Sequence, residues 1–303
     1  MKNLSRYNPL VVSISFILTA VTGIFNLKPI LSMLFLLGAL FLYYSGGYCE
    51  NKKLHWFIII TFFGCALLNP VFSHNGKTVL FFVSNNPITL ESFIYGIFMG
   101  VTVSATVYWF AVYSQLMTSD KVIYTIGKIS KKAALVLAMS LRFVPMFISQ
   151  YKEITASQKA LGLYKDETIF SRIKATARVT DILLTNIIEK TIVTADSMEA
   201  RGYSCSGHTT YNLFRLNKKD YVLLFTTILL FVICIFATAR GNFSFNVYPE
   251  ISVVLKSRLS IAGYISYGLM CICPSIIEGG EKLRWHYLRS KISHSATLNQ
   301  SQN

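Results

Sequence analysis

Charged residues are scarce in this sequence. Asp, Glu, Lys and Arg make up 14% of its 303 residues, whereas about a quarter is usual in soluble domains. Hydrophobic residues make up 53%, and the mean hydropathy is +0.48. These proportions exclude an ordinary soluble domain and predict an integral membrane protein.

Acidic residues are the scarcer of the two charged classes, with 14 Asp and Glu against 29 Lys and Arg, for a net charge of +15. A basic balance is also typical of nucleic-acid-binding proteins, so the distribution of the charges decides between the two classes. Residues 121–219 alone hold sixteen Lys and Arg against seven Asp and Glu. Basic residues concentrate in the cytoplasmic loops of membrane proteins, so we predict a cytoplasmic segment here, a lipid bilayer as surroundings and no nucleic-acid partner.

The usual catalytic motifs are also missing. The sequence has no G-x-x-x-x-G-K-[ST] phosphate loop, no H-E-x-x-H, no G-x-S-x-G and no His/Cys cluster with metal-ligand spacing. Its six cysteines include no C-x-x-C pair, and Glu91 and Glu278 lie near the ends of apolar runs rather than at their centres. We therefore expect no catalytic residue, no metal ligand, no cofactor and no proton relay within the membrane.

Long apolar runs are what the sequence has instead. Six are long enough to cross about 30 Å of hydrocarbon: 9–27, 30–47, 56–73, 89–117, 221–239 and 259–277. With 121–219 inside, both termini and the Lys52–Lys53 loop are cytoplasmic and the loop 74–88 is outside, as the distribution of basic residues requires. The loop 240–258 fits less well, because Arg240, Lys256 and Arg258 would lie outside. The first run also resembles the start of a cleaved signal peptide, but no A-x-A cleavage site follows it.

This pattern predicts an all-α polytopic integral membrane protein with about six transmembrane helices and a cytoplasmic domain of long amphipathic helices. Its predicted parts are a membrane domain of four spans at 1–117, cytoplasmic helices at 118–220, two further spans at 221–280 and a cytoplasmic tail at 281–303. The chain is expected in the cell membrane as a multi-pass protein.

A long amphipathic helix is predicted over 170–201. Its apolar positions follow a helical period: Phe170, Ile173, Ala177, Leu184, Ile187, Ile188, Ile192, Ala195 and Met198. At 1.5 Å per residue the helix would be about 48 Å long. Gly202 is placed to adopt the left-handed conformation that ends a helix, and Arg201 lies in the last turn, where the helix dipole favours a cation.

A second helical run, from Pro145 to Gly162, is predicted to end in the same way. SQKALGL at 157–163 matches SMEARGY at 197–203 in Ser, Ala and Gly, although two unrelated helix ends would also show this much similarity. The apolar stretch 133–148 upstream contains Arg142 and Pro145. A central arginine costs at least about 2.5 to 3.5 kcal/mol in an inserted helix, so we predict that this stretch lies at the cytoplasmic edge of the membrane and is not a seventh span.

A charged helix end of this kind suits docking. Arginine offers several directed donors to the carboxylates or carbonyl groups of a partner. The simpler alternative is that Arg201 only caps its own helix in solvent.

The sequence resembles the transmembrane T component of energy-coupling factor (ECF) transporters, the EcfT/CbiQ family, which includes the membrane subunit of cobalt and nickel uptake systems. The resemblance extends over nearly the whole chain. It is carried by NPVFSHNGKTVLF (69–81), NPITLESFIYG (86–96), SLRFVPMF (140–147) and the paired ALG (160–162) and ARG (200–202) motifs.

The resemblance implies a non-catalytic coupling subunit of an ECF-type ABC importer for a vitamin or a metal ion. Two ABC-type ATPases would dock on the two helix ends, and a membrane-embedded substrate-binding S subunit would move with them. The implied docking residues are Ala160, Leu161, Gly162, Ala200, Arg201 and Gly202. Arg142, Pro145, Glu199 and Tyr203 are expected to support the same helices.

The first motif departs from the family pattern, because Leu161 stands where arginine is common. The first helix would then lack charge-assisted hydrogen bonds worth about 1.5 to 3 kcal/mol, although Lys159 is nearby.

Two alternative functions would require other features in the spans. An intramembrane enzyme would need clustered polar residues within the spans, and a standalone secondary transporter would need charged or broken helices near the midplane.

Overall fold

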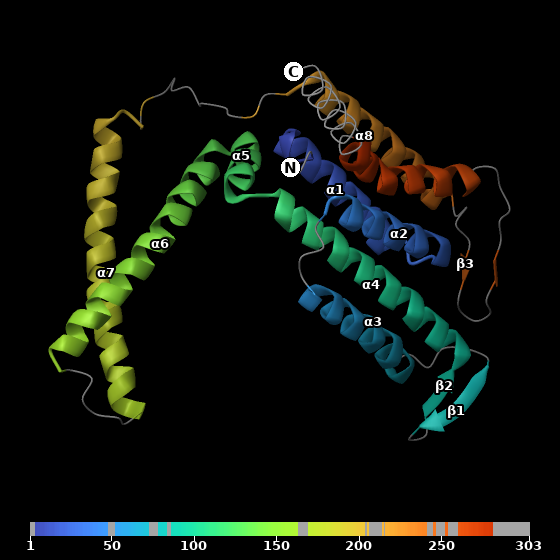
Figure 1. Ribbon diagram of the computed structural model, residues 1–303, viewed down its shortest axis with the longest axis horizontal. Coiled ribbons are helices and arrows are strands. Elements are labelled where there is room, and N and C mark those ends of the chain that lie inside the picture. The colour runs from blue at the N-terminus through green and yellow to red at the C-terminus, as the bar shows by residue number, and fades with distance from the viewer. Residues whose placement is uncertain are drawn as a thin grey trace, which may run out of the picture. The chain divides into compact units, whose positions relative to one another are not determined.

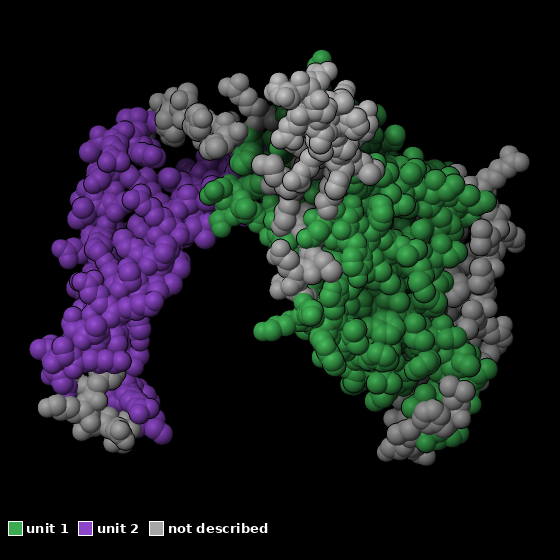
Figure 2. Space-filling model, viewed as in Figure 1, with its two compact units in different colours: residues 1–121, 214–303 green, residues 122–213 purple. Residues whose placement is uncertain are grey.

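The computed structural model describes residues 4–47, 52–72, 78–83, 86–162, 169–203, 205, 214, 216–240, 245–246, 252–253 and 260–280. The chain divides into two compact units (Figure 2). Unit 1 comprises residues 1–121 and 214–303, and unit 2 comprises residues 122–213. The predicted cytoplasmic tail at 281–303 and most of the predicted loop at 240–258 lie outside the described residues.

The described part of unit 1 contains six long apolar helices, which lie where the sequence predicted six spans. They are α1 (Pro9–Phe25), α2 (Pro29–Ser45), α3 (Lys52–Phe72), α4 (Leu90–Leu116), α8 (Lys218–Ala239) and the helix Ser260–Gly280 (Figure 1). A short 3-10 helix, η1 (Leu4–Arg6), precedes them. Proline occupies the first position of both α1 and α2, where its missing N–H costs no hydrogen bond. The prediction of an all-α membrane protein is confirmed.

Length and hydropathy select a slightly different set of candidate spans. Five described helices are long and apolar enough to cross a membrane: α3, α4, α8, Ser260–Gly280 and α6 (Lys131–Ala160), whereas α1 and α2 have 17 residues each. Seventeen residues is the lower limit for a span. The helix α6 includes Arg142 and belongs to unit 2 together with α7 (Ile169–Ala200). The location of residues 133–148 at the membrane edge stays a prediction.

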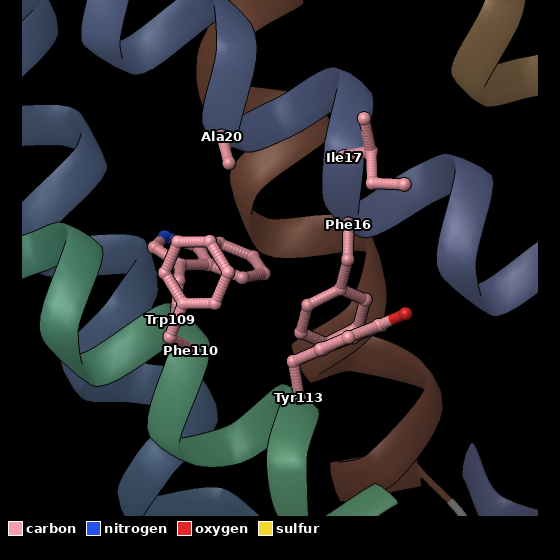
Figure 3. A pocket seen from close by; sticks show the side chains of 6 residues that line it. All are labelled: Phe16, Ile17, Ala20, Trp109, Phe110 and Tyr113. Carbon is pink, nitrogen blue, oxygen red and sulfur yellow. The ribbon is translucent and has the colours of Figure 1, made fainter. Parts of the chain in front are cut away.

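Aromatic side chains hold the centre of unit 1. The Trp109 ring lies 5.0 Å from the Phe16 ring, edge to face, and 5.9 Å from the Phe35 ring, stacked. All three rings are buried, so α1, α2 and α4 share one core. A small apolar pocket of about 40 Å³ remains between α1 and α4, lined by Phe16, Ile17 and Ala20 from α1 and by Trp109, Phe110 and Tyr113 from α4 (Figure 3).

Small residues bring α4 directly against α3. A methyl group on Gly96 would lie 3.0 Å from the carbonyl oxygen of Ala66, and one on Gly100 would lie 3.0 Å from that of Phe62. The G-x-x-x-G spacing therefore serves contact between two spans of this chain.

Two short antiparallel strand pairs join the helices where the sequence suggested only loops. The pair β1 (Val79–Val83) and β2 (Asn86–Thr89) occupies the predicted loop 74–88 and extends one residue beyond it, and β3 (Phe245–Asn246) pairs with β4 (Ser252–Val253). Glu91, at the start of α4, is buried and accepts a hydrogen bond of 2.7 Å from the Thr78 hydroxyl. This buried carboxylate ties Thr78, directly before β1, to the start of α4.

Two further buried carboxylates attach the N-terminal segment to the last helices of unit 1. The backbone N–H of Leu4 donates to Oε2 of Glu278 at 2.7 Å, and the N–H of Asn8 donates to Oδ1 of Asp220 at 3.1 Å. The other oxygen of Asp220 accepts from the N–H of Asn217 at 2.8 Å, which caps the start of α8. We call these contacts the N-terminal clasp. The sequence identified Glu278 only as an acidic residue near a span end.

Between α4 and α6, the chain continues through α5 (Ser119–Ile129). The side chain of Lys121, in its first turn, is buried and its Nζ donates to the carbonyl oxygen of Leu116 at 3.0 Å. Burial lowers the pKa of the Lys121 ammonium. The contact ties the start of α5 to the end of α4.

Candidate functional site at the ends of two long helices

Unit 2 is built mainly from α6 and α7, which pack against each other and cross while running in opposite directions (Figure 1). The helix α6 has 30 residues and α7 has 32, so each is about 45 to 48 Å long. Because they are antiparallel, their C-terminal ends lie at opposite ends of the pair. The observed α7 matches the helix predicted over 170–201 within one residue at each end.

Pro145 does not begin or end a helix. The sequence suggested a helical run over 145–162, whereas α6 begins at Lys131 and continues through Pro145. The dihedral angle that proline imposes is compatible with a helix, and its cost is the loss of one backbone hydrogen bond and crowding of the preceding turn. The Ser130 hydroxyl caps the start of α6 by accepting from the N–H of Ala133 at 3.4 Å. The helix therefore begins well before Pro145.

The apolar face predicted for α7 is not the face that it buries in this chain. No residue of α6 is buried, and in α7 only Ala175 and Val179 are. These short side chains are one turn apart, which allows a close helix crossing. Several of the larger apolar residues of the predicted face remain exposed to more than half of their area: Ile173 at 62%, Leu184 at 53%, Ile188 at 59% and Ile192 at 56%. Ile187 and Met198 are partly buried.

The C-terminal end of α7 forms a complete Schellman motif. Gly202 has a φ of +79°, in the left-handed region as predicted. Its N–H donates to the carbonyl oxygen of Glu199 at 2.9 Å, and the N–H of Tyr203 donates to that of Met198 at 3.2 Å. These two bonds satisfy carbonyl groups that the helix end would otherwise leave without a donor.

The C-terminal end of α6 repeats this geometry over its described residues. Gly162 has a φ of +72°, and its N–H donates to the carbonyl oxygen of Lys159 at 3.0 Å. The matched serines also behave alike. The Ser157 hydroxyl donates to the carbonyl oxygen of Glu153 at 3.0 Å, and the Ser197 hydroxyl to that of Val193 at 2.7 Å. The two motifs therefore have the same backbone form.

The two ends differ in the side chain that they present. Leu161 is 72% exposed, and Arg201 is also exposed. Ala160 and Ala200 precede them and add little bulk. One end thus offers an apolar side chain and the other a guanidinium, on nearly identical backbones. Such exposed ends can enter a groove on another protein, and the guanidinium can donate to carboxylate or carbonyl oxygens there.

Of the residues expected to support these ends, Glu199 and Tyr203 belong to the α7 cap, where Tyr203 is 51% exposed. Arg142 lies elsewhere, in the N-terminal half of α6. It lines an open groove of about 700 Å³ between α6 and α7, to which Arg201 and Tyr203 also contribute. The structure brings Arg142 and the α7 end to one groove and leaves Leu161 outside it. The described residues include no group of three or more His, Cys, Asp or Glu that could hold a metal ion.

Comparison with known proteins identifies the family. A family profile named CbiQ, described as cobalt transport protein, matches residues 3–211. An EcfT protein of Lactobacillus helveticus, named as an energy-coupling factor transporter transmembrane protein, is 34% identical over 99 residues, which cover 32% of this chain and 36% of that protein. EcfT 1 of Listeria monocytogenes is 25% identical over 195 residues, covering 59% and 70% of the two chains.

A third relative, an uncharacterized protein of Mycoplasma pneumoniae, is 30% identical over 110 residues, which cover 36% of this chain and 25% of that protein. The matched region thus covers only 25% of the length of the Mycoplasma pneumoniae protein and 36% of the length of the Lactobacillus helveticus protein. The profile, in contrast, matches more than half of this chain, and the five candidate spans agree with a multi-pass membrane protein. The chain belongs to the CbiQ family of cobalt transport proteins.

Proposed function

We propose that the chain is the transmembrane coupling (T) subunit of an ECF-type ABC importer. It would link two cytoplasmic ABC-type ATPases to a membrane-embedded S subunit that binds a vitamin or a metal ion. The chain itself would hydrolyse no ATP, its partners would supply that activity, and both of its termini would be cytoplasmic. The names of the relatives support the type of transporter.

The observation that carries the proposal is the pair of matching helix ends in unit 2. A Schellman motif turns the backbone away from the helix axis directly after the last residue. The last turn and its side chain then project without a following segment of helix. Two such ends, at opposite ends of one antiparallel pair, suit simultaneous docking on two ATPase subunits, and relative motion of the ATPases would turn the pair.

The difference between the ends predicts unequal docking. Arg201 would donate charge-assisted hydrogen bonds to its ATPase, each worth about 1.5 to 3 kcal/mol. Leu161 would contribute only apolar contact, up to about 2 kcal/mol for a leucine fully buried in the complex. The α7 end is therefore proposed as the stronger attachment.

The exposed apolar face of α7 supports a contact with the third partner. Ile188 and Ile192 lie one turn apart on this face, and both are more than half exposed. Large exposed apolar surfaces commonly mark protein or membrane contacts. We assign this face to the S subunit, which would move when α6 and α7 move.

The test is co-purification from the native membrane in mild detergent. Tagged wild type, Arg201→Glu and the control Arg178→Glu are compared, because Arg178 is an exposed arginine in the interior of the same helix. We expect ABC-type ATPases to co-purify with wild type and Arg178→Glu and to be lost with Arg201→Glu. Absence of any ATPase from the wild-type eluate, or equal loss from both variants, would refute docking through this end.

A further inference from the structure

The groove between α6 and α7 has a composition that the docking proposal does not use. It is an open groove of about 700 Å³ that lies wholly within unit 2. Its apolar lining includes Met139, Phe143 and Met146 from α6, with Val193 and Met198 from α7. A lining of flexible methionines and an aromatic ring adapts to chains of irregular shape.

Cations from both helices border this apolar lining. Arg142 on α6 and Lys190 on α7 both line the groove, and Arg201 lies at the end of α7. Within the described part of the chain, neither Arg142 nor Lys190 forms an ion pair or a hydrogen bond through its side chain. Glu189 is the one acidic residue among the described residues of the lining, against Arg142, Lys190 and Arg201, so the net charge of the lining is positive. An anionic group would therefore find unoccupied donors beside an apolar surface.

We infer that this groove binds an acidic phospholipid. The phosphate would lie between the guanidinium of Arg142 and the ammonium of Lys190, and an acyl chain would lie along Met139, Phe143 and Val193. Cationic side chains next to apolar surface are the combination that recognises anionic lipid head groups. The inference concerns a different ligand from the ATPases and does not depend on docking through Arg201.

A lipid fits these observations better than an acidic peptide does. The wall formed by α6 continues outside the groove into exposed apolar side chains, among them Val136 at 64% and Val144 at 53%. An 18-residue stretch of α6 is also as apolar as the corresponding stretches of α4 and Ser260–Gly280, which are candidate membrane spans. A surface of this composition is compatible with contact with a bilayer, which supplies phosphate and hydrocarbon in one molecule.

The experiment uses the full-length protein in mixed micelles that contain a photoactivatable phosphatidylglycerol or, in parallel, a photoactivatable phosphatidylcholine. The double variant Arg142→Gln/Lys190→Gln removes both cations. The control Lys174→Gln/Arg178→Gln removes two exposed cations of α7 that do not line the groove. Labelled peptides are identified by mass spectrometry, and melting temperatures verify that all variants are folded.

We expect phosphatidylglycerol to label peptides that contain residues 139–146 and 193–198 in wild type and in the control. The double variant should need about 25-fold more lipid for half-maximal labelling, at about fivefold for each cation near the head group. Equal labelling by phosphatidylcholine, or unchanged labelling in the double variant, would overturn the inference. Loss of labelling on addition of glycerol 3-phosphate would also overturn it, because the ligand would then be a soluble phosphate. If the double variant instead lost a co-purifying protein and neither lipid labelled the groove, the groove would be a protein contact.

Discussion

The N-terminal clasp allows a stability prediction with a worked magnitude. Asp220 is 2% exposed and accepts from two backbone N–H groups, those of Asn8 at 3.1 Å and of Asn217 at 2.8 Å. Loss of a capping side chain costs about 0.5 to 2 kcal/mol, and loss of the acceptor of a buried N–H costs about 1 to 3 kcal/mol. Asp220→Ala should therefore destabilise unit 1 by about 1.5 to 5 kcal/mol, or lower its melting temperature by roughly 3 to 20 °C.

The buried thiols of the same unit provide the assay. Cys234 and Cys271 are 1% and 0% exposed, so a thiol-reactive fluorescent dye reaches them only on unfolding, while the exposed Cys205 reacts at once. Asp220→Asn keeps one acceptor oxygen and should melt between Asp220→Ala and wild type. The control is Asp181→Ala, at an exposed position of α7. If Asp220→Ala melted together with wild type, the clasp would not contribute to stability and the reasoning would be refuted.

Three further predictions concern the helix contacts and the docking ends. Gly100→Leu should lower the melting temperature in the same assay by forcing α4 away from Phe62. The control Gly64→Leu should leave it unchanged, because a side chain at this site would meet no atom within 4 Å. Equal melting of the two variants would contradict the close α3–α4 contact. Gly202→Ala places an alanine in the left-handed conformation, at a cost of about 1 to 2 kcal/mol. It should speed amide hydrogen exchange at Tyr203 and reduce ATPase co-purification. Unchanged exchange would argue against the Schellman motif. Arg201→Ala should reduce ATPase association and uptake more than Leu161→Ala does, in pull-down and transport assays on the same membranes, and equal losses would count against unequal docking.

Local signals in the sequence were sufficient for the helices. Apolar runs of adequate length predicted all six long helices of unit 1, and the helical period with Gly202 after it predicted α7 and its left-handed end. Both signals depend on residues within a few turns of one another. The sequence did not join the stretch 133–148 to the helical run from Pro145, because proline indicated a boundary where α6 in fact continues from Lys131. The hairpin of β1 and β2 was also missed, since strands this short carry no clear periodicity.

Contacts between distant residues could not be predicted. Only the fold identifies Ala66 and Phe62 on α3 as the neighbours of Gly96 and Gly100. The apolar period of α7 predicted an amphipathic helix but not what its apolar face contacts. In the structure the buried residues of α7 are Ala175 and Val179, and much of the predicted apolar face remains exposed.

The sequence by itself determined the membrane class, the positions of the apolar helices and the two glycine-terminated helix ends, because hydropathy, helical period and the conformational freedom of glycine act over short segments. Only the tertiary structure decided that Asp220 and Glu278 hold a segment 212 and 274 residues away, and that Arg142 and Lys190 border one groove. These relations depend on how helices pack across long separations in the chain, and a single sequence carries no local signal for that packing.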